Sequence, residues 1–311
     1  MTEGPRTPLP AGGQNAVAVT FGLLGDEWTL LILRQAHLGV SRYQDWREQL
    51  PISDAVLTAR LARLTEHGLL TRDAYQQRPV RYEYRLAPRG LAVWPVLVAI
   101  WGWEFRWVAG RREELPWMRH RSCGRDSEPV LSCASCGERA GPRDVRSVIG
   151  PSGEAARCIP AAVTRRRSTS GDAGEAGLFP ETMALIGNRW SVALLGAAFL
   201  GDRRFGQFQQ RLGAPPTMVA DRLRTFCALG VLRATGSDYR LTAKGRAFFP
   251  VVMTLIDWGQ RWYAAPEGPT LVSVHRSCGR EFLPRLVCSE CGERLVERDV
   301  LVVDGARAGA P

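Results

Sequence analysis

Lysine is almost absent from this chain, and long hydrophobic runs are missing. Lys244 is the only lysine among 311 residues, so arginine carries nearly all of the positive charge behind a formal net charge of +10. No apolar run reaches the length of about 18 residues that a membrane-spanning helix requires. The N-terminus, MTEGPRTPLPAGGQN, lacks the basic and apolar regions of a signal peptide. The sequence therefore predicts a cytoplasmic protein without a membrane partner.

The arginine-rich charge leaves two interpretations open. The planar guanidinium fork suits phosphates and guanine edges, which favours a nucleic-acid partner. A GC-rich genome, however, raises arginine content by itself, so charge alone does not decide the matter. The length of 311 residues and the hydrophobic content of 45% predict at least two domains with ordinary cores.

Histidine is also scarce, and its distribution argues against an enzyme. Two of the four histidines begin the same pattern, HRSCGRDSEPVLSCASCGER from His120 and HRSCGREFLPRLVCSECGER from His275. Both stretches have the spacing His-x2-Cys-x9-Cys-x2-Cys and together use six of the eight cysteines. Only His37 and His67 remain for acid–base chemistry, and no catalytic constellation surrounds them. We predict that the protein is not an enzyme.

The repeated pattern predicts two structural Zn²⁺ sites. Cytoplasmic thiols stay reduced, so paired cysteines there favour metal over a disulfide. Three thiolates and one imidazole can complete a tetrahedral site, and we expect each segment to hold its own ion. The predicted ligands are His120, Cys123, Cys133 and Cys136 in the first segment and His275, Cys278, Cys288 and Cys291 in the second. A thiol redox switch and inert cysteines are the alternatives, and another group could replace either histidine as the fourth ligand.

The whole chain is a tandem duplication. Trp28 aligns with Trp190 at an offset of 162, whereas Trp103 aligns with Trp258 at an offset of 155. The second copy has therefore lost seven residues between these points (162 minus 155). The offset of 155 continues through both cysteine patterns, because His275 follows His120 by the same interval. Each half is one complete unit.

Within the first copy, capping and turn residues together with hydrophobic periodicity predict a helix-turn-helix. Helices are expected over residues 14–24, 27–37 and 41–50, followed by the tight turn PISD. Ser53 is the expected N-cap of the next helix, whose Leu57, Leu61 and Leu64 share one face. The opposite face carries small residues, a composition that lets a helix enter a major groove. An ordinary alanine-lined solvent face is the alternative.

A polar hairpin follows this helix and predicts a wing. Two β-type runs in LLTRDAYQQRPVRYEYRL flank a basic tip, and a helix-turn-helix followed by such a hairpin is typical of a winged helix. In the second copy the hairpin shrinks to VLRATGSDYRL, so its wing should be short and nearly neutral. The predicted DNA-binding residues of the two copies are Arg42, Ser53, Ala55, Thr58, Ala59, Arg60, Arg63, Arg78, Arg81, Arg204, Thr217, Arg222 and Arg224.

These residues carry a family resemblance. The stretches GQNAVAVTFGLLGDEWTLLILRQAHLG, SRYQDWREQLPISDAVLTARLARLTEHGLL and VRYEYRLAPRGLAVWPVLVAIWGW resemble the HxlR-type winged helix-turn-helix transcription regulators, as do IGNRWSVALLGAAFLGDRRFGQFQQRLGAPP and YRLTAKGRAFFPVVMTLIDWG in the second copy. The resemblance implies a bacterial DNA-binding regulator that pairs its subunits through the first and last helices and reads an inverted repeat. Members that sense electrophiles carry a cysteine where Ala16 and Leu178 stand here, which puts that chemistry in doubt.

The predicted fold is mainly α with small β wings (α+β), with two winged helix-turn-helix domains, each followed by a small zinc ribbon. The expected boundaries are a flexible tail 1–12, domain 13–112, ribbon 113–149, linker 150–174, domain 175–265, ribbon 266–303 and tail 304–311. The run TRRRSTS at 164–170 is either a solvated tether or a basic arm.

The predicted function is sequence-specific regulation of transcription, with repression as the expected outcome. The partner is double-stranded DNA, read mainly by the first domain, while the second domain completes an intramolecular pseudo-dimer. Further homodimer formation and the existence of a small-molecule effector are left open. The alternative is a protein-interaction scaffold with degenerate winged helices and partner-recruiting ribbons.

Overall fold

The computed structural model describes residues 5–160 and 179–303. The predicted basic run at 164–170, most of the expected linker and the C-terminal tail lie outside these ranges. The first winged-helix unit comprises α1 (Ala16–Leu24), α2 (Glu27–His37), α3 (Tyr43–Gln49), α4 (Asp54–Glu66), β2 (Leu70–Gln77), β3 (Val80–Leu86), α5 (Pro88–Leu91) and α6 (Trp94–Trp107). The second winged-helix unit comprises α8 (Pro180–Ile186), α9 (Arg189–Phe199), α10 (Phe205–Leu212), α11 (Pro216–Ala228), β7 (Leu232–Thr235), β8 (Asp238–Leu241), α12 (Ala243–Ala247) and α13 (Phe249–Trp262).

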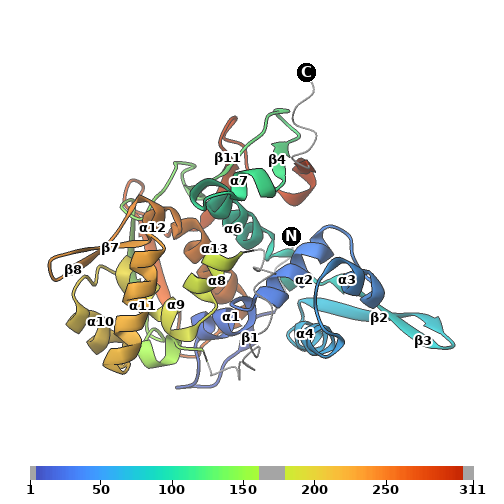
Figure 1. Ribbon diagram of the computed structural model, residues 1–311, viewed down its shortest axis with the longest axis horizontal. Coiled ribbons are helices and arrows are strands. Elements are labelled where there is room, and N and C mark those ends of the chain that lie inside the picture. Colours follow the sequence, from blue (N-terminus) through green and yellow to red (C-terminus); the bar gives the residue numbers. More distant parts are fainter. Residues whose placement is uncertain (1–4, 161–178, 304–311) are drawn as a thin grey trace.

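The two cysteine patterns lie in short strands outside these units. The first cysteine segment (residues 113–149) contains β4 (Trp117–His120), β5 (Pro129–Cys133) and β6 (Val145–Ile149), preceded by α7 (Arg111–Glu114). The second cysteine segment (residues 266–303) contains β10 (Leu271–His275), β11 (Pro284–Cys288), η2 (Glu297–Asp299) and β12 (Val300–Val303). In Figure 1, β4 and β11 lie near α6 and α7, while α2, α3, α4 and the first hairpin lie on one side of α1 and α9, α10, α11 and the second hairpin lie on the other.

The local structure of the first unit agrees with the prediction from sequence. The second predicted helix has the expected bounds of 27–37, and α4 begins directly after Ser53, although α3 begins at Tyr43 rather than at residue 41. Leu57, Leu61 and Leu64 are buried on the inner face of α4. This hydrophobic face packs the helix onto α2 and leaves its other side in solvent. The chain therefore has two winged helix-turn-helix domains of mixed α and β structure.

The two wings differ as the deletion predicts. In the first unit, strands β2 and β3 pair antiparallel from Leu70–Leu86 to a tip at residues 78–79. In the second unit, β7 and β8 pair over four residues each, from Leu232–Leu241 to Thr235–Asp238. The first wing projects from the molecule in Figure 1, whereas the second is a short hairpin.

The two units pack against each other through their first and last helices. Helix α1 packs on α13, and α6 contacts both α13 and α8. Two tryptophans at equivalent positions cross the boundary: the Trp103 Nε1–H donates to the Lys244 carbonyl at 3.1 Å, and the Trp258 Nε1–H donates to the Arg89 carbonyl at 3.0 Å. Because each closing helix is buried between two units, it is apolar over more than one face.

The cysteine segments are interwoven rather than independent. Each of their strands pairs antiparallel with a strand of the other segment: β4 with β12, β5 with β11, and β6 with β10. The expectation of one self-contained ribbon after each domain therefore differs from the structure. The edge of a strand carries backbone N–H and C=O groups to be paired, and here a strand of the other copy pairs with one edge of each.

Two further segments differ from their expected character. Within the expected tail 1–12, β1 (Thr7–Pro8) pairs in parallel with β9 (Tyr263–Ala264), and the Gly12 N–H donates to Glu267. The start of the expected linker folds into η1 (Ala155–Cys158), which packs against α1.

The longest helices among the described residues, α6 and α13, have 14 residues each. No single helix in this part of the chain is long and apolar enough to cross a membrane, although α1 and α2, bent by 77°, pass the length and composition test as a pair.

Candidate metal centres and nucleic-acid interface

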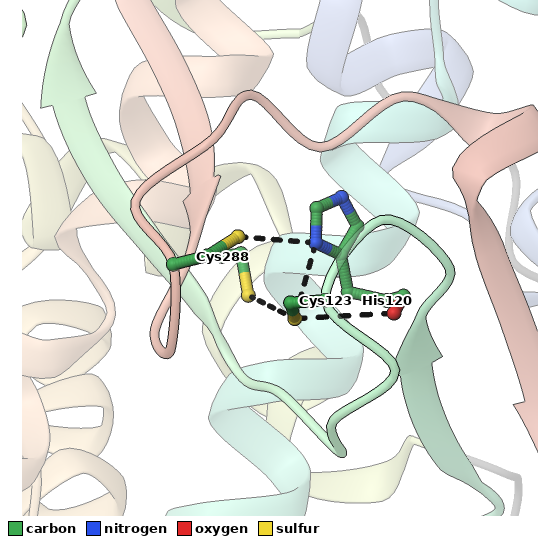
Figure 2. A group of neighbouring side chains, drawn as sticks. His120, Cys123 and Cys288 are labelled. Carbon is green, nitrogen blue, oxygen red and sulfur yellow. Dashed lines mark hydrogen bonds between the residues drawn. The ribbon is translucent and has the colours of Figure 1, made fainter.

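The eight predicted metal ligands form two clusters of four. One cluster contains His120, Cys123, Cys288 and Cys291, and the other contains Cys133, Cys136, His275 and Cys278. In each cluster the ligand atoms all lie within 4.8 Å of one another. Figure 2 shows His120 and Cys123 of the first cysteine segment facing Cys288 of the second.

The grouping of ligands within one segment was therefore wrong. Each cluster takes its His-x2-Cys pair from one segment and its Cys-x2-Cys pair from the other. The crossed strand pairing is the cause, because His120 ends β4 and Cys133 ends β5, and these strands pair with β12 and β11 rather than with each other. The sequence could not distinguish the two groupings, since both copies have identical spacing.

The clusters have the dimensions of a tetrahedral zinc site. With Zn–S near 2.3 Å and Zn–N near 2.0 Å, such a site separates two sulfurs by about 3.8 Å and a sulfur from a nitrogen by about 3.5 Å. The Cys123 and Cys288 sulfurs lie 3.8 Å apart, and His120 Nδ1 lies 3.5 Å from Cys123 Sγ and 3.3 Å from Cys291 Sγ. The donor set of three sulfurs and one imidazole nitrogen thus fits Zn²⁺.

The second cluster repeats this geometry. His275 Nδ1 lies 3.5 Å from Cys278 Sγ and 3.3 Å from Cys136 Sγ. Both ligand histidines are almost fully buried and turn Nδ1 toward the sulfurs, which identifies Nδ1 as the donor atom. The four glycines that follow ligand cysteines in the knuckles, at 124, 137, 279 and 292, all have positive φ, a conformation that glycine adopts without strain.

Backbone amides stabilise the thiolate form of the inner cysteines. Burial alone would raise the pKa of the Cys288 thiol, but the N–H groups of Cys291 and Glu290 and the Ser127 hydroxyl lower it below its ordinary value. Burial and backbone N–H groups act in the same opposed way on Cys133, whose pKa is also lowered. A thiolate is the form that binds metal, so the knuckles prepare these sulfurs for coordination.

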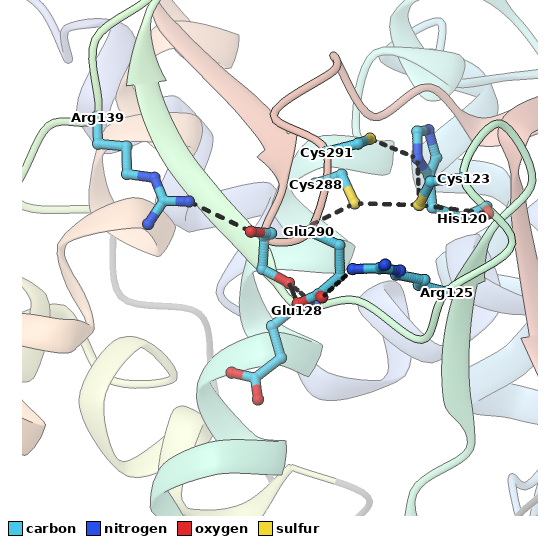
Figure 3. Close-up of polar contacts among 9 residues, drawn as sticks. His120, Cys123, Arg125, Glu128, Arg139, Cys288, Glu290 and Cys291 are labelled. Atoms are coloured by element: carbon cyan, nitrogen blue, oxygen red, sulfur yellow. Dashed lines mark hydrogen bonds and ion pairs between the residues drawn. The ribbon is translucent and has the colours of Figure 1, made fainter.

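The polar surroundings of the first cluster also join the two segments. Figure 3 shows Arg125 beside Glu290, with 3.6 Å between their charged groups, and Arg139 donating to the Ser289 carbonyl at 3.2 Å. The Glu128 N–H donates to the Ser289 hydroxyl at 3.1 Å. These contacts link residues of the first segment with the Cys-x2-Cys loop of the second.

The outer face of α4 is exposed and small. Ala55, Thr58, Ala59 and Ala62 are all exposed, as is Ser53 at the N-cap. The Tyr43 hydroxyl, from α3, donates to Asp54 Oδ1 at 2.9 Å and lies 3.4 Å from the Thr58 hydroxyl. The helix thus presents methyl groups and one hydroxyl to solvent, with the Tyr43 hydroxyl beside Thr58.

Two arginines of α4 that were predicted to bind DNA are held by the protein itself. Arg60 makes a two-point ion pair with Asp26, at 2.7 and 2.8 Å, and Arg63 donates to the Gly22 carbonyl at 2.9 Å. Burial raises the pKa of Asp26, but hydrogen bonds and charge attraction from Arg60 outweigh it, so the pKa is lowered. Both arginines connect α4 to the preceding helices, and the sequence prediction missed Asp26 because it lies 34 residues from Arg60.

The other predicted arginines of the first unit lie in solvent. Arg78 at the tip of the wing and Arg81 on β3 are both exposed. Arg42, also exposed, precedes α3 and stacks over the Tyr75 ring at 4.7 Å. The structure therefore places exposed guanidinium groups on the wing and beside the start of α3.

In the second unit, the face of α11 that corresponds to the outer face of α4 carries different residues. Its α11 carries Thr217 in the open, but Asp221 stands where α4 has Ala59. Arg222 makes a short ion pair with Asp221, and Arg224 approaches the same carboxylate at 3.5 Å. Asn188 replaces Asp26, so Arg222 lacks the partner that Arg60 has. Arg204 is exposed, 3.7 Å from Asp238. The charged side chains on this face of the second unit are therefore largely paired with one another.

Two helix-turn-helix units, each with a wing, define the class of the protein. The HxlR-like helix-turn-helix family model matches residues 23–112 and 185–267, more than half of the chain. The chain belongs to this family.

Two proteins of known sequence and one solved structure are similar to parts of this chain. The HTH-type transcriptional regulator MT3179 of Mycobacterium tuberculosis (strain CDC 1551 / Oshkosh) is 39% identical over 125 residues, covering 38% of this chain and 79% of the relative. The HTH-type transcriptional regulator sll1512 of Synechocystis sp. (strain ATCC 27184 / PCC 6803 / Kazusa) is 40% identical over 79 residues, covering 25% of this chain and 58% of the relative. A solved Pseudomonas aeruginosa structure, PA1374, is 31% identical, covers 40% of this chain and 85% of that one, and has a TM-score of 0.33. MT3179 and sll1512 are named as regulators of transcription, not as enzymes.

Proposed function

We propose that the protein is a sequence-specific DNA-binding regulator of transcription that reads a major groove with α4. The exposed small face of α4 carries this proposal, because methyl groups and a hydroxyl can contact thymine methyls and base edges there. Family membership and the regulator names of its relatives support it. The reading residues are Ser53, Ala55, Thr58 and Ala59.

The flanking arginines bind the DNA backbone in this proposal. Arg42, Arg78 and Arg81 are exposed and supply charge for phosphates or the minor groove. Arg60 and Arg63 act differently from the sequence-based prediction: they hold α4 at its angle through Asp26 and Gly22. Because neither guanidinium is free, their removal would misalign the helix rather than delete a base contact.

The second unit serves as the intramolecular partner of the first. Thr217, Arg204, Arg222 and Arg224 supply a weaker half-site contact, because Asp221 occupies the centre of its face and pairs with two of these arginines. A regulator of this kind acts by occupying DNA, and repression follows when it covers a promoter, since no further contact with polymerase is required.

Zn²⁺ is the proposed occupant of both clusters, with a structural role. Four protein ligands close each site, so no position is left for a substrate. Each ion would join the two cysteine segments and thereby the two winged-helix units, since each cluster draws ligands from both segments. The free energy of metal binding would then stabilise the relative position of the two units.

The test of DNA reading is the variant Ala59→Asp, which copies the residue found in the second unit. A carboxylate there repels phosphates and removes the methyl contact, so affinity for the specific duplex should fall roughly tenfold or more, in line with about 1–3 kcal/mol for a base contact. Fluorescence anisotropy with a duplex from the gene's own upstream region, beside a random duplex, at two salt concentrations measures this.

The matched control is Ala228→Asp, which places the same charge on an exposed position of α11 where the first unit already has Glu66. Its affinity should stay within about twofold of the wild type, as for most surface substitutions. Equal affinity of Ala59→Asp and wild type for the specific duplex would contradict reading by α4.

A further inference from the structure

Two cavities occupy equivalent places at the junctions between a winged-helix unit and the strands. The smaller, of about 150 Å³, lies among α2, α6, β4 and β12. The larger, of about 310 Å³, lies among α9, α13, β10 and β6. The lining residues correspond through the offsets of the duplication, so Leu97 and Val98 in the first match Val252 and Met253 in the second.

Three replacements open the larger cavity. Trp94 and Trp101 line the smaller cavity, whereas Phe249 and Ile256 stand at the matching positions of the larger one. Arg34 on α2 becomes Gly196 on α9, at an offset of 162. A Cβ built on Gly196 would meet nothing within 4 Å. The second copy has thus lost side-chain volume at the same junction that the first copy fills.

The smaller cavity is also closed by a polar contact that the larger one lacks. His37 Nδ1 lies 2.7 Å from Glu297 Oε1, a contact between α2 and the second cysteine segment. The matching residues in the larger cavity are Phe199 and Pro142, whose side chains can make no such bond. Side chains of the protein therefore narrow the first junction, whereas the second leaves more space for a ligand.

The walls of the larger cavity define the ligand that fits. Most of its lining is aliphatic or aromatic, and Val17 and Phe21 of α1 add a wall from the first unit. Its charged lining residues are Arg146, Arg211 and Arg276, with no aspartate or glutamate among the described residues that line it. Arg211 is paired with Asp202 at 2.9 Å, but Arg146 and Arg276 are exposed.

We propose that this cavity is a binding site for a small apolar molecule that carries one negative charge, such as an aromatic carboxylate or sulfonate. Its volume lies at the lower end of the range for small-molecule sites, about 300–1,000 Å³. The apolar part would fill the space beside Ile256 and Gly196, and the anionic group would lie toward Arg146 and Arg276. Because α1 and α13 both line the cavity, the ligand would contact both winged-helix units.

The test uses 8-anilinonaphthalene-1-sulfonate, an apolar aromatic anion whose fluorescence rises on burial. Wild-type protein should bind it saturably with about one site per chain. Ile256→Trp restores the residue that fills the smaller cavity and should weaken binding roughly tenfold or more, as expected when a ligand loses its pocket. Leu91→Trp is the control, since Leu91 is 41% exposed on α5 and lines neither cavity.

Two further variants separate pocket filling from misfolding and test the charge. Gly196→Leu fills the cavity from a helix position with free space, so it decides the outcome if Ile256→Trp does not fold, as judged by circular dichroism. Arg146→Ala with Arg276→Ala should weaken binding of the sulfonate several-fold and leave binding of neutral N-phenyl-1-naphthylamine unchanged. Unchanged sulfonate binding by folded Gly196→Leu would overturn the site, and equal loss of both probes in the arginine variant would overturn its anion preference.

Discussion

Glu104 and Gly259 occupy matching positions in the two closing helices and meet matching threonines in opposite ways. On α13, a Cβ at Gly259 would come within 2.0 Å of the Thr20 hydroxyl, so only glycine allows this approach of α1. On α6, Glu104 is fully buried and accepts hydrogen bonds from the Thr182 hydroxyl at 2.6 Å and from the Thr182 N–H at 3.0 Å. Burial raises the pKa of Glu104, and the Thr182 hydrogen bonds only partly oppose this.

The raised pKa of Glu104 predicts a pH-dependent stability. The folded state binds the proton more tightly than the unfolded state, so this contribution is present below the unfolded pKa and is lost as pH rises through the folded pKa. Glu104→Gln should therefore raise the melting temperature by a few degrees near pH 7.5 and by less near pH 4, since the amide stays neutral and its oxygen can still accept from Thr182. Differential scanning fluorimetry across pH measures this, with exposed Glu113→Gln as the control. A lower melting temperature for Glu104→Gln near pH 7.5 would refute it.

For single side chains, the sequence predicted burial that depends on the residue's own helix, but it did not predict contacts with partners far away in the chain. The helical period alone placed Leu57, Leu61 and Leu64 inside and Ala55, Thr58 and Ala59 outside. Arg60 and Arg63 were also predicted to bind DNA, yet their partners lie on α1 and before α2, where no local pattern marks them. Tertiary ion pairs of this kind require the fold to be known.

At the scale of elements, the two units differ more in their wings than in their helices. The first hairpin carries eight and seven residues in its strands, whereas the second carries four and four. Both lengths follow from the sequence, because a hairpin's reach is set by its residue count. Arg78 and Arg81 extend beyond anything that the second hairpin offers, so the first wing should dominate contact with the DNA backbone.

The double variant Arg78→Ala with Arg81→Ala tests this role. If both guanidinium groups meet phosphates, the slope of log affinity against log salt should become shallower by about 2, and affinity should fall similarly on specific and random duplexes. Anisotropy titrations at several salt concentrations give the slope. Arg280→Ala with Arg298→Ala removes the same charge from exposed positions in the second cysteine segment and serves as control. A slope equal to that of the wild type would assign the wing a role outside DNA contact.

At the scale of the whole molecule, the duplication has produced an interwoven chain rather than two independent halves. The residues that form the two clusters and their spacing were predictable from sequence, because a tetrahedral site of thiolates and imidazole would impose them. Their grouping was not, since two copies of one pattern allow either self-pairing or crossing with identical local chemistry. Only the strand pairing between segments distinguishes the two.

Two double cysteine variants distinguish crossed from self-contained zinc sites. Cys123→Ser with Cys291→Ser damages one crossed cluster, so about one Zn²⁺ per chain should survive dialysis. Cys123→Ser with Cys136→Ser damages both clusters, so about none should remain, and the melting temperature should fall further because both links between the segments are lost. Metal content by mass spectrometry measures the difference. Self-contained sites would give the reverse order, because Cys123 and Cys136 would then share one ion while Cys123 and Cys291 would not.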